Sequence, residues 1–226
     1  MQYIGAAFLD VDGTLSEDPS CWRAAHRHYG VSDQAMGNYN RYLEHRDFPR
    51  WMREDISLWV GKKHPEKLHV REIQRIFSKP KLISGAQDLI DYLRKERYLV
   101  ELVTLGFSAA IYPVSDALGV PRENVYANDF ELDEHGNLTG EGVPKVFPHK
   151  KSDIARRVCA EAKLKLSESI ALTDTHWDSD LLQSCGTGIA FCPKKGDSVR
   201  NAANHVVEES DLMKVVEYLE SLKTKA

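Results

Sequence analysis

Two aspartates separated by a single residue follow an apolar run near the start of the chain, within the segment FLDVDGTL at residues 8–15. Side chains alternate along an extended strand, so Asp10 and Asp12 are expected on the same side and close to one point. Buried carboxylates are costly unless their charges meet a cation or a substrate. The pair therefore predicts a site at the end of a buried strand, where Gly13 lets the backbone turn away.

A calcium-binding EF-hand loop is the main rival interpretation of this Asp-x-Asp-Gly string. That loop requires glycine at its sixth position and glutamate at its twelfth. Counted from Asp10, Gly13 is fourth and the twelfth position is Cys21. An apolar strand is also expected before the string, where an EF-hand has a helix, so the calcium loop is rejected.

Three later segments carry polar groups that phosphate chemistry needs. Thr104 closes the apolar run VELV, and its hydroxyl and the backbone N–H groups that follow are able to hold a phosphoryl oxygen. Lys150 and Lys151 precede an expected helix, where a cation and free N–H donors together form an anion site. Asp174 and Asp178 follow another apolar run and suit a hard cation such as Mg²⁺.

The elements that must position these residues alternate between strand and helix. Short apolar runs predict buried strands, and longer periodic segments between them predict helices. The strands are expected at 3–11, 98–105, 169–173, 188–192 and, more weakly, 204–207, and the helices at 85–96, 108–118, 152–163 and 178–184. This alternation predicts an α/β fold with a doubly wound parallel sheet, whose strand ends carry the site.

Two segments interrupt the alternation. Residues 17–81 contain aromatic residues at helical spacing, many charges and no convincing strand, so a small insertion of about four helices is expected after the first strand. Residues 125–142 read as a β-hairpin, with Gly136 and Asn137 in the turn.

Composition narrows the class of protein. The chain has 226 residues, 42% of them hydrophobic and 28% charged, with a formal net charge of −4. These values are typical of a soluble globular protein and do not favour nucleic-acid binding. The four cysteines form no Cys-x-x-Cys pair, which argues against structural zinc and a disulfide framework. No apolar stretch approaches the about 18 residues of a membrane span and no secretory signal is recognisable, so a cytoplasmic location is expected.

In order and spacing, these motifs resemble those of the haloacid dehalogenase superfamily: Asp-x-Asp-Gly-Thr, a strand-end threonine, a lysine and a final pair of aspartates. The resemblance covers essentially the whole chain and is greatest to the phosphoserine phosphatase branch. It implies a Rossmann-like core at residues 1–15 and 82–226 and a helical C1 cap at residues 16–81.

The resemblance also implies an enzyme that hydrolyses phosphomonoesters and assigns a role to each motif. Asp10 is the nucleophile that forms an aspartyl-phosphate, and Asp12 is the general acid and base. Thr104, the backbone of Leu105 and Lys151 bind the transferring phosphoryl group. Lys151 is preferred to Lys150 because Ile154, three residues on, begins the buried face of the helix.

The implied cofactor is a single Mg²⁺. Its ligands would be Asp10, the backbone carbonyl of Asp12 and Asp174, while Asp178 orients a water ligand. In this position the ion would offset the repulsion between a carboxylate nucleophile and a phosphate dianion.

The chain departs from the phosphoserine phosphatase pattern at positions that bear on the substrate. Pro19 stands where that branch has a glutamate for the substrate ammonium, and Asp55 stands where it has an arginine for the substrate carboxylate. A carboxylate does not replace an arginine in binding a carboxylate. In the last motif, Trp177 replaces a small polar residue, and its indole either narrows the pocket or packs beneath the cap.

The expected partner is thus a small phosphorylated metabolite whose identity the sequence leaves open, as it does the oligomeric state. Two other functions use the same residues or the same fold. One is phosphoryl transfer to another acceptor, as in a mutase, through the same Asp10 intermediate. The other is a catalytically silent binding module.

Overall fold

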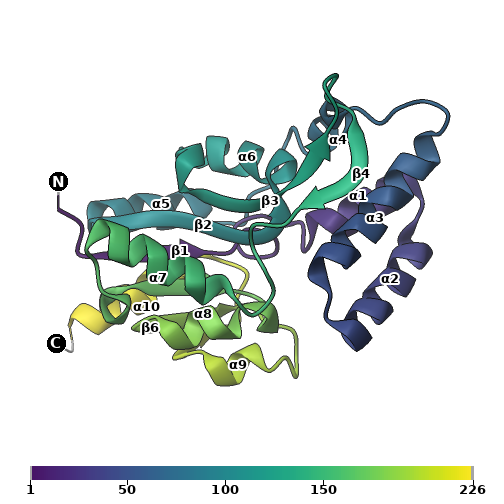
Figure 1. Ribbon diagram of the computed structural model, residues 1–226. Coiled ribbons are helices and arrows are strands. Elements are labelled where there is room, and N and C mark those ends of the chain that lie inside the picture. Colours follow the sequence, from purple (N-terminus) through teal and green to yellow (C-terminus); the bar gives the residue numbers. More distant parts are fainter. Residues whose placement is uncertain (1, 225–226) are drawn as a thin grey trace.

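The computed structural model describes residues 2–224 and contains one sheet flanked by helices on both faces (Figure 1). The strand order is β4-β3-β2-β1-β5-β6-β7, and every neighbouring pair is parallel except β3 and β4. The strands are β1 (Gly5–Leu9), β2 (Tyr98–Phe107), β3 (Val125–Leu132), β4 (Leu138–Val143), β5 (Ile170–Thr173), β6 (Thr187–Phe191) and β7 (His205–Val207).

Helices separate most of the strands along the chain, five of them between β1 and β2. They are α1 (Cys21–Tyr29), α2 (Ser32–His45), α3 (Phe48–Lys63), α4 (Val70–Ile76), α5 (Ala86–Lys95), α6 (Ser108–Ala117), α7 (Lys151–Ala162), α8 (Ser179–Ser184), α9 (Val199–Ala202) and α10 (Met213–Lys223). Three short 3-10 turns complete them: η1 (Arg122–Asn124), η2 (Leu166–Glu168) and η3 (His176–Asp178).

The central strand β1 is buried on both faces, and its side chains divide between two cores. Ala7 and Leu9 belong to the core beneath α5, α6 and α10, whereas Ala6 and Phe8 belong to the core beneath α7, α8 and α9. This two-residue alternation is the pattern expected of a strand covered on both sides. The predicted doubly wound α/β fold is therefore confirmed.

Strand β2 is longer than predicted and is irregular at the predicted site. It runs to Phe107 rather than ending at Leu105, and its pairing with β3 shifts register between Val103 and Phe107. Residues 104–106 therefore lie at a break in the regular ladder. Apolar patterning gives no signal for such a break, because only the hydrogen-bond register shifts.

The predicted hairpin is present as β3 and β4, and β3 joins the main sheet beside β2. Gly136 adopts a positive φ of 80° in the turn, as its predicted place there suggests. The turn is organised by Asp133, whose carboxylate accepts hydrogen bonds from the backbone N–H groups of His135 and Asn137, both at 2.9 Å.

Helices α1 to α4 lie together at one end of the sheet, beside the hairpin (Figure 1). Their apolar residues share a core with Phe107, Phe130 and Leu138. The segments before and after these helices run side by side: the N–H of Glu17 donates to the Lys81 carbonyl, and the N–H of Ile83 to the Leu15 carbonyl, both at 2.9 Å. Division into domains at residues 16–81 stays a prediction.

Within residues 2–224, no helix combines the length and the apolar character that crossing a membrane requires.

Candidate active site

Three of the predicted site residues lie in or just beyond three neighbouring strands. Leu9 of β1 pairs with Leu102 of β2 on one side and with Leu172 of β5 on the other. Asp10, one residue beyond this paired row, and Thr104 and Asp174, two residues beyond it, therefore lie at the same carboxyl side of the sheet. The first residue after β1 is tied to β5, because the Asp10 N–H donates to the Leu172 carbonyl at 2.9 Å.

Lys151 is the first residue of α7 and reaches this edge from the side. Its Nζ donates to Asp10 Oδ1 at 2.8 Å and to Asp178 Oδ2 at 2.7 Å, and the residue is only 1% exposed. Burial alone would lower the pKa of Lys151, but the charges of Asp10 and Asp178 raise it above its ordinary value. Lys150, by contrast, is exposed, with its Nζ 5.9 Å from the Phe147 ring centroid. The geometry favours Lys151 over Lys150 at the site.

The two late aspartates surround the same point. Asp178 is fully buried; the Thr173 hydroxyl donates to its Oδ2 at 2.6 Å, and its Oδ1 has no hydrogen-bond partner among the described residues. Burial raises the pKa of Asp174 and of Asp178, and the neighbouring Asp10 charge raises both further. The surplus of carboxylate over ammonium charge here is the state that a bound cation would relieve.

Gly13 makes room for Asp174. Its φ is +77°, a conformation that other residues rarely adopt, and a Cβ at this position would lie 2.6 Å from Asp174 Oδ2. The glycine of the first motif therefore serves both the turn and the close approach of a carboxylate.

Asp12 is half-buried and turns toward α1. Its Oδ2 accepts a hydrogen bond from the Cys21 N–H at 2.8 Å. Burial raises the pKa of Asp12 to about 7, although the hydrogen bonds from Cys21 act in the opposite direction. A carboxyl group with this pKa is able both to donate and to accept a proton near neutral pH.

Thr104 and Leu105 lie at the register break of β2. Thr104 is 1% exposed, and its Oγ1 accepts a hydrogen bond from the Gly106 N–H at 3.0 Å. The Leu105 carbonyl accepts two hydrogen bonds, from Trp22 Nε1 at 3.0 Å and from Asn128 Nδ2 at 2.9 Å. These donors fix the backbone where no regular ladder holds it.

The donor set fits a hard cation. Carboxylate oxygens are the ligands that Mg²⁺ prefers, and the partnerless Asp178 Oδ1 is a buried polar atom of the kind that an ion or its water satisfies. Among residues 2–224, no group of three or more His, Cys, Asp or Glu side chains is arranged as a metal cage. Mg²⁺ usually keeps several waters and is held by one or two carboxylates, so such a cage is not required.

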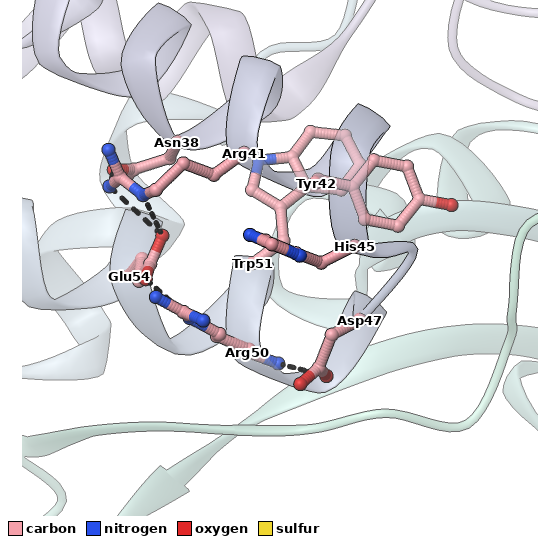
Figure 2. Close-up of a pocket in the computed structure, with 8 residues that line it drawn as sticks. All are labelled: Asn38, Arg41, Tyr42, His45, Asp47, Arg50, Trp51 and Glu54. Atoms are coloured by element: carbon pink, nitrogen blue, oxygen red, sulfur yellow. Dashed lines mark hydrogen bonds and ion pairs between the residues drawn. The ribbon is translucent and has the colours of Figure 1, made fainter.

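Two pockets lie near the helices α1 to α4. A cleft of about 320 Å³ borders Asp12 and Cys21 and is otherwise lined by residues 16–18, 76–77 and 79–81 and by α6. Figure 2 shows the other, between α2 and α3, where Glu54 accepts hydrogen bonds from Arg41 and Arg50. Its volume of about 10 Å³ is roughly that of one water, so only the first pocket has room for a small molecule.

The two positions that depart from the phosphoserine phosphatase pattern differ in their surroundings. Pro19 is exposed. Asp55 is 3% exposed; it accepts a hydrogen bond from Asn38 Nδ2 at 2.7 Å, and its Oδ2 lies 3.2 Å from His26 Nε2. Trp59 Nε1 donates to His26 Nδ1 at 2.9 Å, so the imidazole lies between Trp59 and Asp55 inside the helices α1 to α3.

Trp177 packs beneath α2. Its ring centroid lies 5.9 Å from that of Tyr42 and 6.5 Å from that of Tyr39, and its carbonyl accepts a hydrogen bond from the His149 N–H at 2.9 Å. Of the two alternatives for its indole, the structure favours packing beneath the helices.

Several contacts of the site carried no signal in the sequence. They are the bond from the Thr173 hydroxyl to Asp178 and the bonds from Trp22 and Asn128 to the Leu105 carbonyl. The contacts to the Leu105 carbonyl join elements that are far apart in the chain, and the periodicity of a strand or helix does not predict contacts between distant elements.

Comparison with known proteins agrees with this geometry. Residues 7–183 match the haloacid dehalogenase-like hydrolase family. The chain is 31% identical over 226 residues to a phosphoserine phosphatase of Lactococcus lactis, with 98% of both chains covered. It is 33% identical over 223 residues to a phosphoserine phosphatase of Streptococcus thermophilus, covering 96% of this chain and 97% of the relative.

Solved structures show the same fold. A phospho-aspartyl intermediate analogue of phosphoserine phosphatase superimposes with a TM-score of 0.79 at 22% identity, covering 96% of this chain and 99% of the other. A substrate-bound phosphoserine phosphatase complex gives a TM-score of 0.78 at 21% identity, with 96% and 99% covered. The chain therefore belongs to the haloacid dehalogenase-like hydrolase family and is a phosphatase that resembles the phosphoserine phosphatases.

Proposed function

We propose that this phosphatase hydrolyses a small phosphomonoester in a Mg²⁺-dependent reaction, through an aspartyl-phosphate formed on Asp10. The observation that carries the proposal is the buried Lys151 ammonium, bonded at once to Asp10 and to Asp178. A lysine in this position is an anchor for phosphoryl oxygens as well as a counter-charge for the carboxylates.

In the first step, an Asp10 oxygen attacks phosphorus and the bond from phosphorus to the substrate oxygen breaks. Lys151 bonds Asp10 Oδ1, which leaves Oδ2 as the attacking atom. Asp12, in its protonated form, gives its proton to the departing alkoxide. In the second step, Asp12 takes a proton from a water that attacks the phosphorus, which releases inorganic phosphate and restores Asp10.

The phosphoryl oxygens are held by groups at the ends of β2 and α7. The Thr104 hydroxyl accepts from the Gly106 N–H and is therefore free to donate its own proton to a phosphoryl oxygen. The Leu105 N–H and the Lys151 ammonium complete the set. Charge moves onto these oxygens as the phosphoryl group transfers, so donors that are already oriented lower the barrier.

Mg²⁺ would be held by Asp10, the Asp12 carbonyl and Asp174, with Asp178 bonded to one of its waters. When bound, the ion neutralises carboxylate and phosphate charge and aligns the two for reaction.

The substrate is proposed to be a small phosphorylated metabolite. The cleft of about 320 Å³ beside Asp12 falls at the lower end of the range of small-molecule pockets, near the group that protonates the leaving oxygen. The similar proteins are named phosphoserine phosphatases, which puts phosphoserine into any test. Asp55 occupies the position where the resemblance places an arginine for the substrate carboxylate, and it offers no cation there, so we expect a leaving group without a carboxylate to be preferred.

The test is hydrolysis of a panel of phosphorylated metabolites, phosphoserine included, and of a generic chromogenic phosphate ester, with Mg²⁺ and with chelator. Inorganic phosphate is expected as the only phosphorylated product, in a Mg²⁺-dependent reaction. Asp10→Asn keeps the shape of the side chain and is expected to reduce turnover at least about a thousandfold. Metal-dependent turnover that survives Asp10→Asn would show that the mechanism is wrong. Transfer of the phosphoryl group to a second metabolite would show that the protein is a phosphotransferase and not a hydrolase.

A further inference from the structure

The first turn of α1 reaches into the candidate site with two consecutive residues. The Cys21 N–H donates to Asp12 Oδ2 at 2.8 Å, and Trp22 Nε1 donates to the Leu105 carbonyl at 3.0 Å. Helix α1 itself packs against α2, α3 and β2. Two hydrogen bonds therefore join the predicted cap to the proposed acid and to the proposed phosphate-binding backbone.

The bond from Trp22 bears on the orientation of Thr104. The Leu105 carbonyl and the Gly106 N–H belong to one planar peptide, so a donor that holds the oxygen also sets the direction of the N–H. That N–H donates to Thr104 Oγ1 at 3.0 Å. A chain of hydrogen bonds thus runs from the indole, through one peptide unit, to the hydroxyl that we propose binds a phosphoryl oxygen.

This peptide has little other support. The pairing of β2 with β3 shifts register between Val103 and Phe107, so residues 104–106 are outside the regular ladder. Besides Trp22, Asn128 Nδ2 donates to the same carbonyl at 2.9 Å. Loss of the indole N–H would leave the oxygen with one partner, so the peptide would gain freedom to tilt without a buried group being stranded.

The Trp22 ring is itself well placed. It packs against Phe107 at 5.2 Å, edge to face, and against Trp59 at 5.4 Å between centroids. Gly106 leaves the space for α1, because a Cβ there would lie 2.9 Å from Cys21 Sγ and 3.2 Å from Thr104 Oγ1. The Cys21 sulfur and the Thr104 hydroxyl thus both lie close to Gly106.

We propose that Trp22 is a positioning residue for phosphoryl transfer: its indole N–H orients the Leu105–Gly106 peptide and, through it, the Thr104 hydroxyl. The inference rests on the proposed function and adds to it a residue from the predicted cap that does not touch the phosphoryl group. It implies that the site is complete only while α1 is seated against β2.

The experiment compares Trp22→Phe with Trp59→Phe. Each variant removes one indole N–H and keeps an aromatic ring. The Trp59 N–H, however, donates to His26 Nδ1 at 2.9 Å inside the helical bundle and contacts no site residue through that bond. Steady-state rates on the chromogenic phosphate ester, thermal unfolding and inhibition by orthovanadate are measured for both variants and for the wild type.

For Trp22→Phe, kcat is expected to fall about tenfold with KM changed less than about twofold, because a donor network that acts in the transition state is loosened. The concentration of orthovanadate that halves the rate is expected to rise by a similar factor. Trp59→Phe is expected to keep wild-type kcat and vanadate inhibition, whatever its effect on the unfolding temperature.

Equal kcat and equal vanadate inhibition in the two variants would overturn the inference while leaving the proposed function intact. A wild type without turnover would instead overturn the proposed function, and the inference with it. If Trp22→Phe does not fold, replacement of Trp22 by benzothienylalanine, which keeps the bicyclic shape and lacks the donor, is measured in its place with the same expected losses.

Discussion

At the scale of single residues, the ammonium of Lys151 is the counter-charge on which the buried carboxylates depend. Removing one partner from a buried ion pair costs about 3–5 kcal/mol, because the remaining charge is left uncompensated. Lys151→Met is therefore expected to lower the free energy of unfolding by about that amount without Mg²⁺. Denaturant unfolding, with and without Mg²⁺, measures both this loss and the part that the ion restores.

The neighbouring lysine provides a matched control. Lys150 is exposed and has no carboxylate partner among the described ion pairs. Lys150→Met is expected to change the free energy of unfolding by less than about 0.5 kcal/mol and to leave turnover near that of the wild type. Equal effects of the two substitutions on the free energy of unfolding would show that the buried carboxylates are not stabilised by the Lys151 ammonium.

Glu101 is a buried carboxyl group of β2, paired in register with Phe8 of β1 and outside the set of proposed catalytic residues. It is 4% exposed, its Oε2 has no partner among the described residues, and burial raises its pKa to about 7. The folded state thus holds a proton that the unfolded chain loses near pH 4.5. Since the folded state binds more protons in that window, stability falls as pH rises from about 4.5 to about 7.

Glu101→Gln removes this titrating group, so the free energy of unfolding of the variant is expected to fall less as the pH rises. At pH 8 the variant should be more stable than the wild type by roughly 2–3 kcal/mol, and the difference should shrink toward pH 4. Denaturant unfolding at several pH values measures it. A difference that does not depend on pH would mean that Glu101 is already ionised in the folded protein.

At the scale of elements, the position of Lys151 depends on how α7 begins. The residue before the helix, Lys150, forms no side-chain cap. Instead, Asp180 of α8 accepts a hydrogen bond from the Ser152 N–H at 2.8 Å. Asp180→Ala is expected to cost about 1 kcal/mol of stability and to lower kcat, because the first turn that carries Lys151 loses its anchor.

A control for this effect lies in the same turn. Asp153 is exposed, and among residues 2–224 its carboxylate pairs only with Arg156, at 2.9 Å. Asp153→Ala should leave kcat unchanged, whereas Asp180→Asn, which keeps an oxygen acceptor, should restore most of what Asp180→Ala loses. If all three variants retain wild-type kcat, the capping contact has no part in placing Lys151.

The same elements show how far the sequence alone leads. The strand ends beside Asp10 and Asp174 were predictable, because buried parallel strands leave continuous apolar runs and their carboxyl ends share one edge. Thr104 was expected to close its strand, but β2 continues to Phe107. The register break in β2 and the cap that Asp180 provides for α7 were not predictable. Both depend on hydrogen bonds between segments distant in the chain, and no local pattern of residue types records them.

At the scale of the whole molecule, an ion held between β1 and β5 would join the two strands and stabilise the fold. At a concentration about a hundred times its dissociation constant, a ligand of the native state adds about 2.7 kcal/mol. For a chain of 226 residues this corresponds to a rise of roughly 5–10 °C in the unfolding temperature. Calorimetry with Mg²⁺ and with chelator tests this, and Asp174→Asn is expected to abolish most of the rise.

Trp177 connects the loop at the end of β5 with the helices α1 to α4. It lies between Asp174 and Asp178 in the chain, its carbonyl accepts from the His149 N–H, and its ring packs against Tyr39 and Tyr42 of α2. The loop that carries the two aspartates and the helices above the sheet therefore share one aromatic contact. We therefore expect loss of this ring to affect the packing of α2 over the site more than it affects the chemical step.

Trp177→Ala is accordingly expected to raise KM about tenfold or more while kcat falls less, since substrate binding would have to bring the loosened helices back over the site. Faster amide hydrogen exchange in α2 should accompany the change. Trp177→Phe keeps an aromatic face against Tyr42 and should recover most of the affinity. A fall in kcat with KM unchanged, and α2 still protected, would show instead that the indole acts on the aspartate loop rather than on the helices above it.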